Sequence, residues 1–166
     1  MYQIDDTVLY GTHGVCKITE ITEQSFGGIA KKYYILKPIH NSGSTVYVPI
    51  ENEILTSKMR RVLSVEEIHS LIRNMPSEKS LWIENEPERK ECYKKIIAKG
   101  DRQELIQIIK ALYLHQQEQS AKGKKLHAAD ERYFKEAEKL LYDEFAMVLN
   151  IKPSQVLPFI MEQVQG

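Results

Sequence analysis

The sequence of 166 residues contains only two cysteines and no long apolar run. Cys16 and Cys92 lie far apart and outside any CxxC pattern, so neither a disulfide framework nor a local zinc site is encoded, and we expect two reduced thiols. No stretch approaches the roughly 18 consecutive apolar residues of a membrane-spanning helix. The opening MYQIDD also lacks the basic and apolar segments of a secretory signal. These absences predict a cytoplasmic protein without a membrane segment, a metal or a cofactor.

Catalytic motifs are missing as well. The sequence has no P-loop, GxSxG, HExxH or GxGxxG pattern, and we therefore do not expect an enzyme. The closest constellation is His13 with Cys16, which stand where a strand is expected to begin. An isolated pair of this spacing favours packing and a turn over a nucleophile or a metal site.

Tryptophan occurs once, in the stretch SEKSLWIENEPE at residues 77–88. Met75 and Pro76 before the stretch are expected to end one helix, and Pro87 suits the first turn of another, so the segment between them has the composition of a loop. Local composition leaves two interpretations of Trp82 open. The ring packs over the adjoining helices, or it is a rigid aromatic presented to a ligand.

Net charge is zero, but the charges are unevenly distributed along the chain. Residues 89–125 contain ten Lys or Arg and four acids, a balance of +6, whereas residues 126–166 contain four bases and seven acids, a balance of −3. Residues 1–57, with four bases and six acids, have a balance of −2. The basic segment is either a solvated helix face or a surface for an anion such as nucleic acid.

The first 60 residues alternate apolar and polar side chains, as short strands do. Strands are expected over residues 7–10, 14–21, 31–39 and 44–50. At hairpin spacing, Gly27 with Gly28 lies between the second and third segments, and Asn41 to Gly43 lies between the third and fourth. This pattern predicts a small antiparallel barrel of four or five strands. The predicted core side chains are Tyr33, Ile35, Leu36, Val46 and Val48. Pro49 lacks an amide donor, so its strand is expected at a sheet edge, open to a partner strand.

The rest of the chain shows helical periodicity and helix caps. Ser64 with Glu67 forms a capping box that begins a helix over residues 65–73. A second helix is expected from about Glu88 to Gly100, and Asp101 caps a third. A long helix with apolar residues between 134 and 148 follows, and a short one is expected over 158–163. The sequence therefore predicts an α+β protein, with a barrel over residues 1–62 and an all-helical domain over residues 63–166.

Several motifs resemble one family. They are IDDTVLYGTHGVCKITEI at 4–21, YYILK at 33–37, TVYVPI at 45–50, MRRVLS at 59–64, the single Trp82, KGDRQEL at 99–105, KALYLH at 110–115 and AEKLLYDEFA at 137–146. Together they resemble the CarD and CdnL family of bacterial transcription regulators. The first module is also similar to the polymerase-interacting domain of the transcription-repair coupling factor.

This resemblance implies a non-enzymatic regulator with a Tudor-like barrel that binds the β subunit of RNA polymerase. Its helical domain would contact promoter DNA at the upstream edge of the melted region, where an exposed tryptophan acts as a minor-groove wedge and stabilises the open complex. Trp82 is the residue that matches this wedge. The polymerase-facing residues would be the edge-strand residues Thr45, Val46 and Tyr47 and a turn around Glu23 and Gln24.

The basic residues near the wedge complete the expected site. The predicted DNA-binding residues are Trp82, Arg89, Lys90, Lys94, Lys95, Lys124, Lys125 and Arg132. We expect a nucleoid-associated monomer, with a domain-swapped dimer through the open strand as the other state. The alternative function is a free-standing module that binds DNA or RNA without polymerase.

Overall fold

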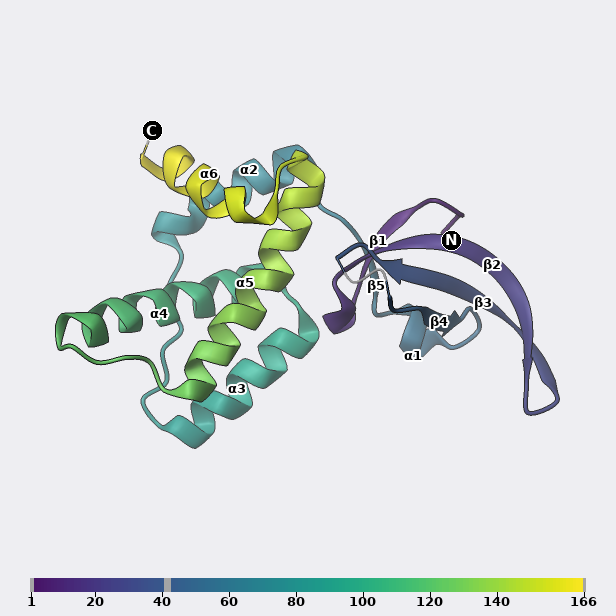
Figure 1. Ribbon diagram of the computed structural model, residues 1–166, viewed down its shortest axis with the longest axis horizontal. Helices are drawn as coiled ribbons and strands as arrows, with labels where there is room; N and C mark the ends of the chain where they lie inside the picture. The colour runs from purple at the N-terminus through teal and green to yellow at the C-terminus, as the bar shows by residue number, and fades with distance from the viewer. Residues whose placement is uncertain (1, 41–42, 166) are drawn as a thin grey trace. The chain divides into compact units, whose positions relative to one another are not determined.

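The computed structural model describes residues 2–40 and 43–165 (Figure 1). The chain divides into two compact units, Met1–Val62 and Leu63–Gly166. Of the two predicted hairpin turns, the one that includes Asn41 and Ser42 lies outside the described residues. Each unit contains its own hydrophobic core.

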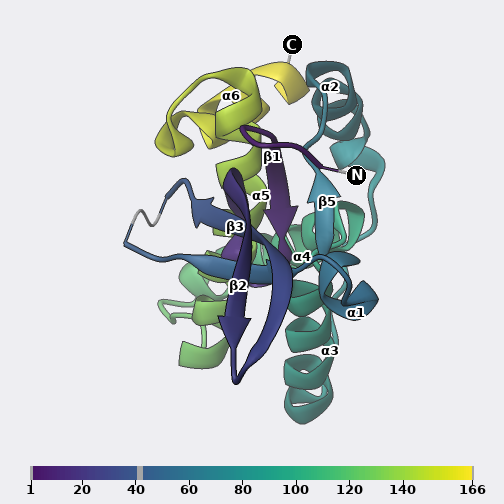
Figure 2. The ribbon, with the colours of Figure 1, turned by 90° about the vertical axis from the view of Figure 1, so that its right-hand side faces the viewer.

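The first unit is a five-stranded antiparallel sheet, which confirms the predicted barrel-like N-terminal domain (Figure 2). Its strands are β1 (Thr7–Tyr10), β2 (Val15–Phe26), β3 (Ile29–Pro38), β4 (Val46–Pro49) and β5 (Met59–Arg61), in the order β4-β3-β2-β1-β5. A 3₁₀ turn, η1 (Gly11–His13), joins β1 to β2, and a short helix, α1 (Glu53–Thr56), precedes β5. Periodicity did not indicate β5 as a strand, because its three residues MRR carry no alternation and pairing with β1 defines it.

Strands β2 and β3 form a ribbon that is longer than the sequence predicted. Gly27 and Gly28 join the two strands with φ values of 62° and 80°. A two-residue hairpin of this kind needs positive φ at both central residues, which glycine adopts without strain. The register continues to the Phe26 and Ile29 pair, so the ribbon extends to its turn.

The core of the first unit lies on β3 and its neighbours. Four consecutive residues, from Tyr33 to Leu36, are buried, so the middle of β3 is covered on both faces. Val48 on β4 is fully buried and Val46 is partly buried, as expected of the predicted core. The intervening Tyr47 is 48 % exposed, which confirms that it points away from the two valines.

The second unit is helical. It contains α2 (Val65–Asn74), the 3₁₀ turn η2 (Met75–Ser77), α3 (Glu86–Lys99), α4 (Arg102–Ala121), α5 (Ala128–Leu149) and α6 (Pro153–Gln165). The predicted capping box forms in full between Ser64 and Glu67. Gly100 ends α3 with a φ of 71°, and the Asp101 side chain caps α4. These local signals place the helix ends near the predicted positions.

Helix α6 differs from its prediction. It begins at Pro153 and continues through Pro158, instead of occupying only residues 158–163. Pro153 fits the first turn, where an amide donor is not needed. Val156 and Ile160 are buried in the core, and this packing stabilises the helix around the interior proline.

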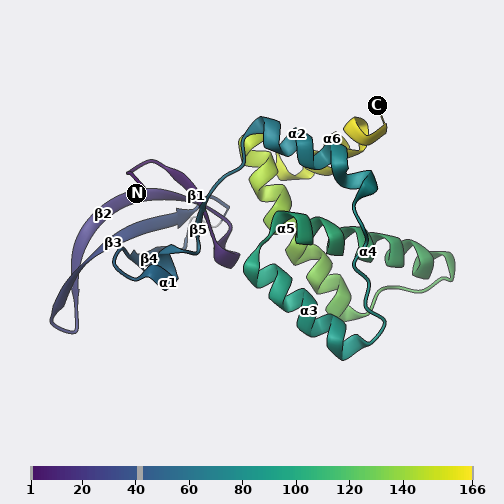
Figure 3. The same cartoon turned by 180° about the vertical axis from the view of Figure 1, so that it is seen from behind.

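The core of the helical unit consists of two clusters of buried side chains that share α4 and α5. Figure 3 shows how the helices of this unit are arranged. One cluster joins α2, α4, α5 and α6 and includes Ile68, Phe145 and Val156. The other joins α3, α4 and α5 around Tyr93 and Leu112, and Trp82 packs against it. Among the described residues, no helix is long and apolar enough to cross a membrane.

Candidate functional site

Trp82 lies in the segment between η2 and α3, which has no regular secondary structure but is held by hydrogen bonds. The Leu81 amide donates to the Gln107 carbonyl at 3.1 Å, and the Leu81 carbonyl accepts from the Tyr93 hydroxyl at 2.7 Å. The Lys110 ammonium donates to the carbonyls of Met75 and Pro76 in η2, at 3.2 and 3.0 Å, just before the segment begins. Side chains of α3 and α4, together with one backbone carbonyl of α4, thus supply hydrogen-bond partners to a loop that has no regular secondary structure.

Arg89 on α3 connects this loop to α5. Its guanidinium forms a bidentate pair with Asp130, with Nε to Oδ1 at 3.0 Å and NH2 to Oδ2 at 2.9 Å. The remaining nitrogen, NH1, donates to the Ile83 carbonyl at 2.9 Å. The Arg89 Cζ atom also lies 4.5 Å from the Trp82 ring centroid. Arg89 therefore holds both the backbone after Trp82 and the ring itself.

The burial of Arg89 corrects one prediction. The side chain of Arg89 is 4 % exposed and that of Asp130 is 1 % exposed. Burial acts to lower the pKa of Arg89, but the hydrogen bonds and the charge of Asp130 reverse this effect and raise it. Arg89 is therefore not the exposed basic residue that the sequence predicted, because its hydrogen-bonding groups are used inside the fold.

His115 on α4 supports the Trp82 ring. The two rings stack with their centroids 4.0 Å apart and an interplanar angle of 25°. Trp82 Nε1 donates to Glu84 Oε1 at 3.2 Å, and the ring as a whole is partly buried. The ring packs against one cluster of the core, as the first interpretation of Trp82 expects, and the side chain is only partly buried. Neither His115 nor Asp130 could be recognised from the sequence as a support of Trp82, because they lie 33 and 48 residues beyond it in the chain.

Three of the predicted DNA-binding residues, Lys124, Lys125 and Arg132, are exposed before and at the start of α5. Lys124 and Lys125 are exposed in the connection before α5, directly before Leu126, which packs in the same cluster as Trp82. Arg132 is exposed on the first turns of α5, with its guanidinium 5.5 Å from the Tyr133 ring. Along the chain, the two lysines precede and Arg132 follows Asp130, the partner of Arg89.

The lysines of α3 are less closely linked to the ring. Lys90 is partly buried and forms an ion pair with Glu86 at 3.3 Å. Lys94 and Lys95 are exposed on the second half of α3, after Tyr93. No contact links either of them to Trp82 in the described part of the chain.

Part of the +6 balance of residues 89–125 is internal. Arg89 binds Asp130, and Arg102 binds Glu144 through Nε at 2.8 Å and NH2 at 2.7 Å. Both carboxylates come from α5, outside the basic segment, and both are buried. The exposed basic charge is therefore contributed by lysines, whereas the two arginines hold helices together.

The predicted polymerase-facing strand β4 forms one edge of the sheet, next to β3. The Tyr47 ring meets Tyr33 edge to face at 6.3 Å, and the exposed Thr45 directly precedes the strand. Pro49 ends the strand without an amide donor, as the sequence predicted for an edge.

Glu23 and Gln24 are not in a turn, contrary to the prediction. Both residues lie within β2, where they pair with Lys32 and Lys31 of β3. Tyr47 pairs with Ile35, so its register position lies three residues, about 10 Å along the strand, from that of Glu23. The two parts of the predicted surface are thus separated on the sheet, because β2 continues through Glu23 and Gln24 to Phe26 before the chain turns at Gly27 and Gly28.

Cys16 and His13 do not form a reactive pair. Cys16 is fully buried, and burial raises the pKa of its thiol to about 11, so the thiolate that a nucleophile requires is disfavoured. The His13 ring is exposed and stacks on Tyr10 at 5.8 Å. Within residues 2–40 and 43–165, no group of three or more His, Cys, Asp or Glu side chains is placed to hold a metal ion.

Comparison with known proteins gives matches along almost the entire chain. Residues 2–63 match the family described as "CarD-like/TRCF RID domain", and residues 64–160 match the family described as "CarD, C-terminal domain". The chain is also similar to "Putative transcription factor YdeB" of Bacillus subtilis (strain 168). The two sequences are 26 % identical over 163 residues, which cover 96 % of this chain and 99 % of the relative.

Proposed function

This chain belongs to the CarD family of transcription regulators, and we propose that it binds the β subunit of RNA polymerase through its N-terminal unit while its helical unit contacts promoter DNA at the upstream edge of the melted region. The observation that carries the proposal is the pair of consecutive family matches, one on each compact unit. In this proposal the chain is a non-enzymatic factor that acts in the cytoplasm.

The edge of the sheet offers a surface for the polymerase. Strand β4 has its backbone at the rim of the sheet, and Tyr47 presents a large, half-exposed aromatic ring beside it. An extended segment of a partner pairs with such an edge through main-chain hydrogen bonds, and side chains near the edge give specificity. Thr45, Val46 and Tyr47 supply this contact, whereas Glu23 and Gln24 form a separate part of the surface.

Replacing Tyr47 with alanine is expected to weaken binding of the full chain to the purified β subunit by about tenfold or more. Truncating a central aromatic of an interface commonly costs more than about 1 kcal/mol, and about 1.4 kcal/mol corresponds to a tenfold change. Surface plasmon resonance measures the affinity. Ile4→Ala is the control, since Ile4 is 52 % exposed but lies before β1, and its affinity is expected to match that of the parent. Equal losses in both variants would argue against β4 as the docking edge.

The helical unit offers Trp82 on a preorganised support. Arg89 and His115 hold the ring before any ligand binds, so little conformational entropy is lost on contact with DNA. Wedging an aromatic ring between base steps costs about a few kcal/mol in a stacked duplex and less where the strands already separate. The ring therefore favours the open promoter over the closed one, and only such differential binding shifts the equilibrium.

Binding to polymerase would allow a few lysine contacts to hold the helical unit on promoter DNA. A chain already bound to polymerase holds its helical unit near the promoter at an effective concentration on the order of millimolar. Weak phosphate contacts from the exposed Lys124 and Lys125 then give substantial occupancy. If the full chain fails to bind the β subunit but retains affinity for DNA or RNA, it acts instead as a free-standing nucleic-acid-binding module.

The double variant Lys124→Gln and Lys125→Gln is expected to reduce the salt dependence of promoter binding. Each lost phosphate contact removes about 0.9 from the slope of log affinity against log salt, so the slope should fall by about 2. The measurement is a titration of polymerase-bound promoter DNA at several salt concentrations. Lys135→Gln is the matched control, because Lys135 pairs with Glu131 on α5, and it should leave the slope unchanged. An unchanged slope in the double variant would remove these two lysines from the DNA contact.

A further inference from the structure

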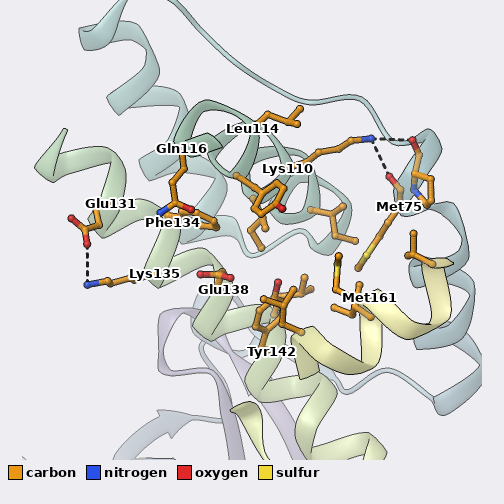
Figure 4. Close-up of a pocket in the computed structure, with 18 residues that line it drawn as sticks. Met75, Lys110, Leu114, Gln116, Glu131, Phe134, Lys135, Glu138, Tyr142 and Met161 are labelled. Atoms are coloured by element: carbon orange, nitrogen blue, oxygen red, sulfur yellow. Dashed lines mark hydrogen bonds and ion pairs between the residues drawn. The ribbon is translucent and has the colours of Figure 1, made fainter. Parts of the chain in front are cut away.

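A groove between α4, α5 and α6 in the helical unit has no part in the proposed function. It encloses about 590 Å³ and lies on the side of α4 that bears Lys110, Leu114 and Gln116 (Figure 4). Phe134, Glu138 and Tyr142 of α5 line it, and Met161 of α6 faces them. The volume lies within the range of sites that bind specific ligands, about 300 to 1,000 Å³.

The rims of the groove carry a concentration of exposed apolar side chains. On α6, Leu157, Met161 and Val164 are 46, 44 and 41 % exposed and follow one another at helical spacing. On α4, Tyr113 and Leu114 are 48 and 46 % exposed. The stripe on α6 covers two helical turns, about 10 Å, and is distinct from the stripe through which α6 packs on the core. An exposed apolar stripe of this length can pack against the apolar face of a helix from another protein.

Four charged side chains line the groove, Lys110, Glu131, Lys135 and Glu138, and the first three have charged or carbonyl partners within the fold. Lys110 donates to the carbonyls of Met75, Pro76 and Glu78, and its charge acts on the nearby Glu78 carboxylate. Glu131 and Lys135 form an ion pair at 3.3 Å.

Glu138 is the remaining charged group. No Lys, Arg or His within residues 2–40 and 43–165 forms an ion pair with it. Burial raises the pKa of the Glu138 carboxyl, and a hydrogen bond with Tyr142 opposes this shift. The groove therefore combines apolar walls with one half-buried carboxylate that a cation would complement.

We propose that this groove binds an amphipathic helix of a partner protein, with apolar side chains at i, i+4 and i+7 between α4 and α6 and a lysine or arginine that reaches Glu138. The two-turn stripe on α6 sets the spacing of the apolar anchors. The Glu138 carboxylate, which lines the groove and has no ion-pair partner among the described residues, sets the sign of the charge. A partner bound here and a polymerase bound at β4 use different units of the chain.

Model peptides test the specificity of the groove. The probe is an acetylated, amidated helical peptide of about 16 residues on an alanine and glutamine background. It carries leucines at i, i+4, i+7 and i+11 and one lysine beside the second leucine. A matched peptide carries glutamate in place of the lysine. Calorimetric titration of the full chain should show the lysine peptide binding about tenfold more tightly than the glutamate peptide.

Three variants locate the binding. Glu138→Gln should reduce the preference for the lysine peptide to less than about threefold, and it keeps the fold because it removes a charge that burial disfavours. Leu157→Glu, at an exposed rim position, should weaken both peptides about tenfold or more. Val65→Glu is the control, since Val65 is 40 % exposed at the start of α2 and does not line the groove, and it should bind both peptides as the parent does.

Several results would overturn the proposal. One is equal affinity for the two peptides, and another is a charge preference that survives Glu138→Gln. Loss of binding in Val65→Glu as great as in Leu157→Glu would show that the groove is not the site. If sedimentation finds a dimer of the parent that Leu157→Glu converts to a monomer, the occupant is a second copy of the chain. If 1-dodecylamine binds in the groove while neither peptide does, the ligand is a small cationic amphiphile.

Discussion

Asparagine in place of Asp130 is expected to lower the free energy of unfolding of the helical unit by about 3 to 5 kcal/mol. The substitution leaves the Arg89 guanidinium buried without its counter-charge, at a place where its side chain is 4 % exposed. Because Arg89 also holds the Ile83 carbonyl and the Trp82 ring, the loop should loosen as well. Urea unfolding followed by the fluorescence of Trp82, the single tryptophan, reports on this unit.

The neighbouring residue provides a matched control for this variant. Glu131 pairs with Lys135, and the two side chains are 52 and 75 % exposed. An ion pair at the surface contributes at most about 1 kcal/mol, so Glu131→Gln should change stability by no more than that. A loss below about 1 kcal/mol in Asp130→Asn would contradict the importance of the buried pair.

The second large effect is expected at Glu144. Its Oε2 atom accepts from the Leu63 amide at 2.8 Å and from Arg102 NH2 at 2.7 Å, and its side chain is 1 % exposed. Glu144→Gln removes the charge that balances Arg102. It should cost about 3 kcal/mol, the lower end for a broken buried pair, because the Arg102 side chain is 18 % exposed and keeps some contact with water.

The same urea experiment tests Glu144→Gln. Glu136→Gln is its control, since Glu136 is exposed on the same helix, and its stability should stay within about 0.5 kcal/mol of the parent. Amide exchange gives an independent readout, because the Leu63 amide should exchange faster when its acceptor is weakened. Unchanged exchange at Leu63 together with parental stability would show that the contact does not hold the start of the helical unit.

Local signals in the sequence predicted most of the fold. Alternation predicted β1 with its observed bounds, and the capping residues Ser64 and Asp101 predicted where α2 and α4 begin. These features depend on residues a few positions apart, so they are visible without tertiary structure. Helix α6 was predicted less well, because a single interior proline suggested a boundary that core packing overrides.

The support of Trp82 was not predictable, because it depends on residues far apart in the chain. Arg89 and Asp130 are 41 residues apart, and composition suggested an exposed arginine in a basic segment. Charge counts do not show whether an acid elsewhere neutralises a base. Likewise, the separation of Glu23 from Tyr47 follows from the register across β3, which the sequence does not specify.

The lifetime of the promoter open complex tests the central claim most directly. Purified RNA polymerase forms open complexes on a promoter, and their decay is followed after addition of a competitor, with no factor, with the parent chain or with Trp82→Ala. Affinity for the β subunit and thermal stability are measured for both chains, so that all complexes are compared at saturation. We expect the parent to lengthen the lifetime and Trp82→Ala to return it toward that of polymerase alone. Equal lifetimes with the parent and with Trp82→Ala would contradict a role for the ring in stabilising the open complex.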